Sequence, residues 1–282
     1  VVLLSVLASC AGPAHEAGPR DRVGLHPTSS MTGVPTTTVP TTSATTVPEP
    51  VATAPTTVPP AARAEPSTPA PATTAAPAPA LLVTRLVGVG SATQVIAVSA
   101  SGYGQTVATL TAYQDDATGW HQVFGPWQAN VGYGGFAPPG QKREGDGRTP
   151  SGSFGFDFFF GVLADPGVQF PYRPVTGPNL VWDDDPSSPL YNQWVDTNTS
   201  PAGAAPEPMD NTPAYDYGAV IAYNTSPTVP GAGSAIFLHV SSGVATVGCV
   251  ALPTSELLAV LRWLSPAAQP RIIMGTAATI AP

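Results

Sequence analysis

A long low-complexity tract between residues 11 and 80 restricts where this chain can fold. The tract consists mainly of Thr, Pro, Ala and Val, as in the stretch 34–40 (VPTTTVP), and it contains no aromatic residue and few charges. This composition offers too little apolar surface for a core and favours polyproline II conformations, so we predict a disordered linker. Fully extended at about 3.1 Å per residue, the linker would reach roughly 200 Å. Folding is therefore expected only in residues 81–282.

The residues before the linker indicate export. Val1–Ala8 is largely apolar and leads into Leu7-Ala8-Ser9-Cys10, which resembles the cleavage site of bacterial lipoprotein signals. We interpret residues 1–10 as a truncated signal segment, much too short to span a bilayer. Lipidation of Cys10 would anchor the protein to the outer face of the bacterial cytoplasmic membrane, with the linker reaching the cell wall. An ordinary signal peptide, in which Cys10 has no role, is the alternative.

The cysteine count bears on the second thiol. Cys10 and Cys249 are the two cysteines of the chain. They either pair as one disulfide or, if Cys10 is acylated, leave Cys249 free. A free thiol in an oxidising compartment is a liability unless it is used, so the lipoprotein interpretation favours a reactive Cys249.

The composition of residues 81–282 narrows the classes of function. This part is large enough to bury a substantial core, and it holds all five tryptophans. It carries seven Lys/Arg and fourteen Asp/Glu, a net charge of −7, which argues against nucleic acid and anionic membrane surfaces as direct partners. There is no phosphate-binding glycine loop and no zinc-ligand spacing. We therefore predict neither a metal nor a cofactor.

The hydrophobic pattern predicts a mainly β domain, beginning with a meander. Short β-branched or alternating runs are separated by turn residues. The expected strands are Val83–Val89, Gln94–Ser99, Val107–Gln114, Trp120–Phe124, Gly152–Phe156, Ala219–Tyr223, Ala235–Val240 and Arg271–Met274.

One helix near the C-terminus is expected. Pro253 opens it and Ser265-Pro266 ends it. Its predicted apolar face comprises Leu257, Leu258, Leu261 and Leu264. The segment Ala164–Pro213, by contrast, is rich in proline and is expected to be irregular. So long a loop inside a folded domain is usually functional, as a lid or a substrate wall.

A histidine and a cysteine late in the chain are candidate catalytic residues. His239 ends an apolar run, and Gly248-Cys249 follows after a short turn. A thiol is nucleophilic as the thiolate, so it needs a nearby base, which His239 supplies if the turn folds back. Gly248 leaves room for a carbonyl to approach the backbone N–H groups there, as in an oxyanion hole. A lone histidine or a lone buried cysteine is usually structural. Together they indicate catalysis.

These residues resemble the catalytic motif of the L,D-transpeptidase (YkuD-like) family. The resemblance rests on Ile236–His239 followed by Thr246–Val250, and it extends over about Val83 to Gly275. The Thr-Pro-x-Gly turn at 149–152, within Lys142–Gly152, is similar to the entry of that family's catalytic sheet. Further similar stretches are Trp182–Pro186, Tyr191-Asn192 and Ala219–Asn224.

Membership of this family would imply a β-sandwich or barrel catalytic domain with one C-terminal helix. It would also imply acyl transfer on peptidoglycan stem peptides, a role in cell-wall biogenesis and cell shape, and inhibition by carbapenems. Cys249 would attack the carbonyl of the third stem residue to give a thioester, which an amine of a second stem resolves. His239 would be the general base, oriented through the carbonyl of Val240. The N–H groups of Val247, Gly248 and Cys249 would form the oxyanion hole.

The chain departs from the common form of the motif in two places. Val247 stands where a second histidine is common, and Val250-Ala251-Leu252 stands where a polar or basic residue is common. Two other functions therefore stay open. Water in place of the amine would make the protein an L,D-carboxypeptidase. Loss of the reaction would leave a non-catalytic wall-binding lipoprotein.

Substrate contacts are assigned to five further residues, each with a structural alternative. Lys142, Arg143 and Arg148 form a dense basic cluster in an acidic domain, and they either meet stem carboxylates or occupy a solvated hairpin tip. Tyr191 and Asn192 either line a substrate groove or fix the long loop.

Three other features are expected to be structural. We predict packing for Trp182 and a structural role for His121. We expect turn caps, and no cation site, at Asp183–Asp185.

Overall fold

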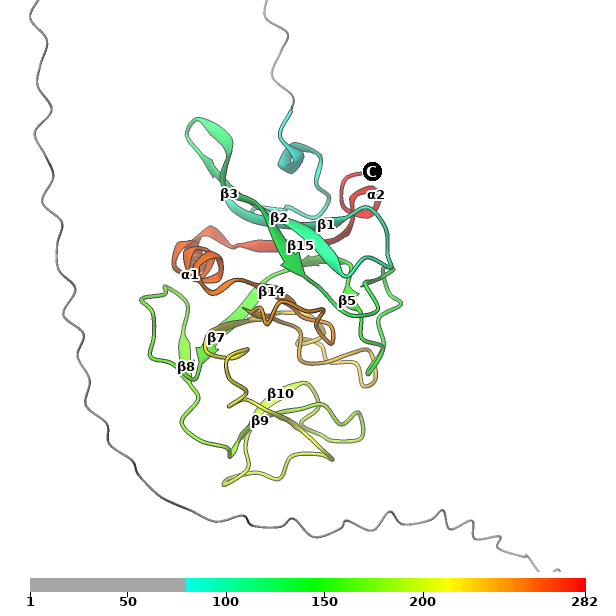
Figure 1. Cartoon of the computed structure of the whole chain (residues 1–282), viewed down its shortest axis with the longest axis vertical. Helices are drawn as coiled ribbons and strands as arrows, with labels where there is room; N and C mark the ends of the chain where they lie inside the picture. Colours follow the sequence, from blue (N-terminus) through cyan, green and yellow to red (C-terminus); the bar gives the residue numbers. More distant parts are fainter. Residues whose placement is uncertain (1–79) are drawn as a thin grey trace, which may run out of the picture. The chain divides into compact units, whose positions relative to one another are not determined.

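A computed structural model describes residues 80–282 of the chain (Figure 1). The predicted signal segment with Cys10, and nearly all of the predicted linker, lie outside the described residues. Within the described part, no helix has both the length and the apolar character that a membrane span requires.

The described residues form a mainly β domain, which confirms the predicted fold class. Its larger sheet contains β1 (Gln94–Ala100), β2 (Val107–Asp116), β3 (Gly119–Asn130), β6 (Gly152–Phe154), β7 (Phe156–Gly161), β8 (Tyr172–Pro174), β12 (Gly218–Ile221), β13 (Phe237–Val240), β14 (Val250–Leu252) and β15 (Arg271–Thr276). These ten strands pair in the order β6-β15-β1-β2-β3-β14-β13-β12-β7-β8.

Smaller elements flank this sheet. A three-stranded sheet pairs in the order β10 (Gln193–Asp196), β9 (Leu180–Asp183), β11 (Glu207–Pro208), and β4 (Phe136–Ala137) pairs with β5 (Thr149–Pro150). The helices are η1 (Leu82–Arg85), α1 (Thr254–Trp263), η2 (Pro266–Ala268) and α2 (Ala277–Ile280).

Three of the four strands of the predicted meander are confirmed, all except the first. β1, β2 and β3 pair antiparallel in sequence order, and β15 joins β1 in parallel. Alternate residues of β2 point to one face, so Ala108, Leu110 and Ala112 are all buried there. This alternation is the pattern from which the strand was predicted.

The predicted strand at Val83–Val89 is wrong. The structure has the 3-10 helix η1 there, followed by turns in which Gly88 and Gly90 adopt positive φ. Val83 and Leu86 are nonetheless buried, against a cluster that includes Ile280. These apolar residues therefore pack on one face of β1, β2 and β15 without joining the sheet. The alternation of apolar residues in so short a run cannot distinguish this arrangement from a strand.

The segment Ala164–Pro213 is less irregular than expected. It contains β8 and the whole of the three-stranded sheet. Two of the short strands, β8 and β11, were missed because they contain proline, which counts against a strand in sequence patterns.

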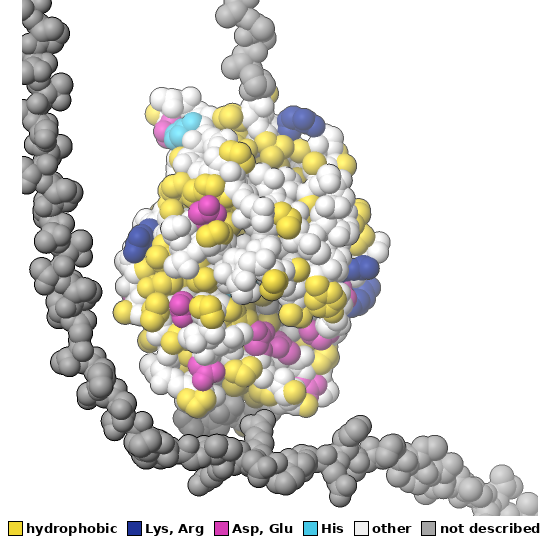
Figure 2. All heavy atoms as spheres, in the orientation of Figure 1, with side chains coloured by type: hydrophobic (Ala, Val, Ile, Leu, Met, Phe, Trp, Pro, Cys, Tyr) yellow, Lys and Arg dark blue, Asp and Glu magenta, His cyan; other side chains and the backbone are white. Residues whose placement is uncertain are grey.

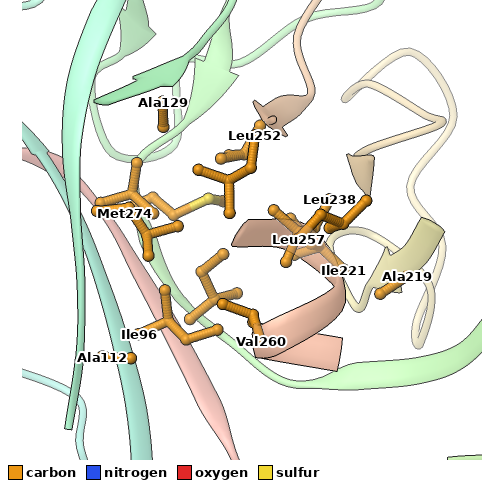
Figure 3. Packing of buried hydrophobic residues seen from close by; sticks show 14 of the residues in the cluster. Ile96, Ala112, Ala129, Ala219, Ile221, Leu238, Leu252, Leu257, Val260 and Met274 are labelled. Carbon is orange, nitrogen blue, oxygen red and sulfur yellow. The ribbon is translucent and has the colours of Figure 1, made fainter. Parts of the chain in front are cut away.

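The helix α1 fills the concave side of the sheet (Figure 3). Its buried face consists of Leu257, Val260 and Leu261, with Leu264 directly after it, whereas the predicted face had Leu258 in place of Val260. These side chains share one core cluster with residues of both halves of the sheet, among them Ile96, Ala112, Leu238, Leu252 and Met274. The large sheet therefore curls around α1.

Leu257 and Leu258 offer a matched test of this packing. Leu257 is fully buried, so Leu257→Ala should lower the free energy of unfolding by about 2–5 kcal/mol. Leu258 lies only partly buried, and Leu258→Ala should cost about 1 kcal/mol. Urea denaturation of the two variants measures both values. Equal losses would contradict the assignment of the buried face.

Candidate active site

The parallel pairing of β13 and β14 positions the predicted cysteine and histidine. Leu238 lies opposite Val250, and His239 lies opposite Ala251. Because parallel strands start at the same edge, residues 241–249 must run back along β13 and deliver Cys249 beside its start. Cys249 and His239 then share one face of the sheet, two residues apart, or about 6–7 Å along a strand.

Both side chains line one cavity of about 200 Å³. Its other lining residues come from the residues just before β13, from the loop after β13, from β14 and from three more distant segments of the chain. They are Lys142, Glu144, Gly145, Asp184, Glu207, Asn211, Ala214, Tyr215, Ser234, Ala235, Ile236, Ser242, Val244, Thr246, Val247 and Ala251.

The thiol of Cys249 is buried and hydrogen-bonded to the main chain at the start of β13 and just before it. The N–H of Phe237 donates to Sγ at 3.3 Å, and the thiol donates to the carbonyl of Ala235 at 3.2 Å. Among the described residues, no hydrogen bond joins Sγ to His239. Burial, and then the charge of Glu207, raises the pKa of the thiol well above its usual range. In this arrangement the cysteine is therefore a neutral thiol.

His239 is held as a neutral imidazole with a defined orientation. Its Nδ1 lies 2.8 Å from the carbonyl of Val240, which can only accept, so Nδ1 carries the proton. Its Nε2 then keeps the lone pair that a general base needs. Burial lowers the pKa of His239, against the opposing effect of the Val240 and Ala214 carbonyls. The ring also packs edge-on against Tyr215, with centroids 5.5 Å apart.

Two threonines hold the carbonyl of Cys249. The Thr246 hydroxyl donates to it at 2.7 Å, and the Thr149 hydroxyl donates to it at 3.2 Å. Thr149 is fixed in turn because its Oγ1 accepts from the N–H of Gly132 at 2.9 Å. Sequence reasoning assigned neither threonine a role, although the Thr-Pro turn at 149–150 was part of the motif.

The backbone N–H groups of Val247, Gly248 and Cys249 are not equivalent. That of Gly248 already donates to Thr246 Oγ1 at 3.1 Å. Those of Val247 and Cys249 have no hydrogen-bond partner within residues 80–282. Gly248 adopts φ 148°, and an added Cβ would lie 3.1 Å from the carbonyl oxygen of Arg148. The site therefore requires glycine at position 248.

An acidic wall, absent from the sequence-based prediction, faces the thiol. It consists of Glu144, Asp184 and Glu207. Ser234 Oγ bonds to Glu144 Oε2 at 2.7 Å and to Asp184 Oδ1 at 2.8 Å, and the hydroxyl of Tyr215 donates to Glu207. Burial, reinforced by the charge of Glu207, raises the pKa of Asp184 to about 7. Burial likewise raises the pKa of Glu207.

The acidic wall comes largely from the segment Ala164–Pro213, which contributes Asp184, Glu207 and Asn211 to the cavity. Figure 2 shows acidic side chains gathered on the lower part of the face in view, over the region where Figure 1 places β9 and β10. The only sequence-based prediction that bears on these residues is that the segment forms a lid or a substrate wall. Its individual residues are too far apart in the chain to form a motif.

The predicted basic cluster is divided by the fold. Lys142 lines the cavity and is buried, with Nζ donating to Asp146 Oδ1 at 2.6 Å and to the carbonyl of Arg143 at 2.7 Å. The side chains of Arg143 and Arg148 are exposed and outside the cavity lining.

Tyr191 and Asn192 lie behind the cavity wall. Both are buried, and neither lines the catalytic cavity. The Tyr191 hydroxyl donates to Glu144, and Asn192 Oδ1 accepts from Trp182 Nε1 at 2.9 Å and from the N–H of Ala235 at 3.1 Å. Their contacts are those of the structural alternative, in which they fix the long loop against the residues that lead into β13.

The remaining sequence-based assignments concern Trp182, His121 and Asp183–Asp185, of which only Asp184 lines the cavity. Trp182 is packed in the core, 2% exposed. Asp183 accepts from the N–H groups of Asp185 and Gly203, as a turn cap does. His121 lies on β3, 3.6 Å from Asp116. Within residues 80–282, no group of three or more His, Cys, Asp or Glu side chains is arranged to hold a metal ion.

Comparisons with known proteins bear on the family. A solved structure, the helical cell shape determining protein Pgp2 from Campylobacter jejuni, is similar at 12% identity with a TM-score of 0.34, over 68% of this chain and 51% of that chain. The chain thus spans about half the length of that structure. No curated protein matches.

The sequence model of the L,D-transpeptidase catalytic domain (YkuD) matches residues 95–277, which is well over half of the chain. The match includes the Thr-Pro turn, the acidic wall and the segment from His239 to Cys249. It confirms the resemblance found in the sequence, and the chain belongs to the L,D-transpeptidase (YkuD) family of cell-wall enzymes.

Proposed function

We propose that this protein is a cysteine acyltransferase that cross-links peptidoglycan stem peptides through a thioester on Cys249. The observation that carries the proposal is the placement of Cys249 and His239 on one sheet face and in one cavity, with Nδ1 of His239 bonded to the Val240 carbonyl. A thiol, a base and a group that orients the base are the components of nucleophilic acyl transfer.

The reaction starts from two neutral groups. His239 Nε2 takes the thiol proton while sulfur attacks the carbonyl of the third stem residue. The resulting oxyanion accepts hydrogen bonds from the N–H groups of Val247 and Cys249. Collapse of this intermediate breaks the peptide bond, and the departing amine of the terminal D-amino acid takes the proton from His239. An amine of a second stem then attacks the thioester and releases the thiol.

Substrate entry must first free the thiol from the Ala235 carbonyl. A hydrogen bond of this kind contributes only about 1 kcal/mol net, so its loss is a small barrier. The thiol can then reach Nε2 of His239, which is already oriented.

Lys142 is the basic residue best placed to meet a stem carboxylate, since it lines the cavity. Arg143 and Arg148 are solvent-exposed, so they would meet only parts of the substrate that extend beyond the cavity. We further propose that lipidated Cys10 anchors the protein to the outer face of the cytoplasmic membrane, with the catalytic domain reaching the wall on its linker.

A non-catalytic wall-binding role is the second candidate. The hydrogen bonds of the Cys249 sulfur favour it, because they go to the main chain of Ala235 and Phe237 and not to the histidine. The two functions differ in whether the thiol can be acylated.

Acylation by a carbapenem is the first test. Intact-mass spectrometry of the wild-type chain should show a covalent adduct, because the inhibitor presents a strained acyl group to the thiol. The Cys249→Ser control should show none. A wild-type chain that stays unmodified while folded would exclude the transferase and favour the wall-binding role.

The base is tested by His239→Ala. The rate of carbapenem acylation should fall by about 10²- to 10⁴-fold, because the proton of the thiol loses its acceptor. His121→Ala is the matched control and should acylate at the wild-type rate. Circular dichroism of both variants reports whether the fold is kept. Unchanged acylation of a folded His239→Ala chain would remove His239 from the mechanism.

The acidic wall is tested by Glu207→Gln. Glutamine keeps an acceptor oxygen for the Tyr215 hydroxyl but removes the charge that raises the pKa of Cys249. The pKa of the thiol should fall, so that at a fixed neutral pH the thiolate fraction rises about tenfold per unit of decrease. The rate of iodoacetamide alkylation measured against pH reports this directly. A slower reaction at neutral pH would contradict the electrostatic role of Glu207.

A further inference from the structure

A second hollow in the domain has no role in the proposed reaction. It has a volume of about 590 Å³ and is lined by residues of β7, β8, β9 and β10 together with Thr225 and Ser226. The hollow is named the β8–β10 groove here. Its chemistry differs from that of the catalytic cavity, because flat aromatic and guanidinium surfaces alternate with hydrogen-bonding side chains.

The flat surfaces are built on a rigid aromatic base. The guanidinium of Arg173 lies over the ring of Phe158, 3.6 Å from its centroid. Trp194 packs edge-on against Phe158 and Phe160, with centroid distances of 5.8 and 5.9 Å. Trp194 is only partly buried, so part of its ring faces the groove. These contacts fix the orientation of both surfaces before any ligand binds.

Two hydrogen-bonding groups of the groove, the indole N–H of Trp194 and the guanidinium of Arg173, have no hydrogen-bond partner among the described residues. The indole N–H groups of Trp182 and Trp263 donate to Asn192 and Gln114, whereas that of Trp194 has no acceptor within residues 80–282. The guanidinium of Arg173 likewise donates no hydrogen bond to another described residue. Gln193 and Asp157 are exposed at the groove and add an amide and a carboxylate.

This combination matches the surface of a sugar ring. A pyranose presents a face of C–H groups, which packs on aromatic or guanidinium planes, and a rim of hydroxyl and acetamido groups, which bond to planar polar side chains. Nucleic acid fits less well, because Asp157 lies in the groove and the folded part of the chain is acidic.

We propose that the β8–β10 groove binds a glycan strand of N-acetylated amino sugars, the polymer to which the stem peptides are attached. The identity of the glycan rests on the proposed function in the cell wall, whereas the carbohydrate chemistry rests on the groove itself.

The groove and the catalytic cavity are connected through neighbouring residues of the chain and one hydrogen bond. Trp182 lines the groove, and Asp184, two residues further along the chain, lines the cavity. Asn192 lines the groove and accepts a hydrogen bond from the N–H of Ala235, the residue whose carbonyl holds the Cys249 thiol. A strand seated in the groove therefore holds its stem peptides close to the nucleophile, which raises their effective concentration there.

The test uses a glycan without peptide. Binding of a β-1,4-linked N-acetylglucosamine oligomer to the full chain is measured by calorimetry and by tryptophan fluorescence. The wild-type chain and Cys249→Ser should bind equally, since the thiol is not part of the groove. Arg173→Ala should weaken binding about tenfold, as expected for loss of a stacking anchor. Trp194→Phe, which keeps most of the packing but lacks the N–H, should weaken it less.

Arg271→Ala is the control, because Arg271 is exposed on β15 and outside the groove. It should bind like the wild type. The proposal is overturned if the oligomer does not bind the wild-type chain, or if Arg173→Ala and Arg271→Ala bind equally. Carbapenem acylation should be the same in wild type and Arg173→Ala, so failure of glycan binding is distinguishable from failure of the catalytic proposal.

Discussion

The parallel pairing of β13 with β14 is the constraint on which the site depends. Two short strands joined by only a loop must start at the same edge, so the loop has to run back the length of β13. The loop therefore places Cys249 beside the start of β13, on the same face of the sheet as His239. The curled sheet and α1 hold the pair of strands from behind, since Leu238 and Leu252 belong to the core that the helix fills. The packing of the core therefore also determines the relative positions of Cys249 and His239.

Electrostatics in the cavity oppose the chemistry that is proposed there. Glu144, Asp184 and Glu207 line the cavity with the buried thiol, and the negative charges of Glu207 and Asp184 disfavour a thiolate. Asp184, with its pKa raised to about 7, changes charge within the neutral range. The reactivity of Cys249 is consequently coupled to the protonation of the acidic wall as well as to His239.

Sequence patterns were informative wherever local periodicity reflects burial. The meander, α1 and the late strand that carries His239 were predictable because alternating or helical apolar positions persist over several residues. The strand at Val83–Val89 and the small sheet within Ala164–Pro213 were not, because tertiary packing and proline decide those segments. In the site, Cys249 and His239 are separated by one loop and were accessible to motif reasoning. Glu144, Asp184 and Glu207 come from three distant segments, and only the folded chain brings them together.

The two hydroxyls that hold the carbonyl of Cys249 have a consequence for how the site is switched on. Because these hydrogen bonds fix the main chain at Cys249, the loop that carries Cys249 has little freedom to rearrange. The remaining freedom of the sulfur is torsion about its own Cα–Cβ bond, which moves it between staggered wells. Such rotations take picoseconds to nanoseconds in mobile side chains and longer in a packed site, still far faster than turnover of a typical enzyme. The fraction of molecules ready for attack would then equal the population of the Cys249 rotamer that points toward His239. A substrate would need only to shift the equilibrium between the rotamers.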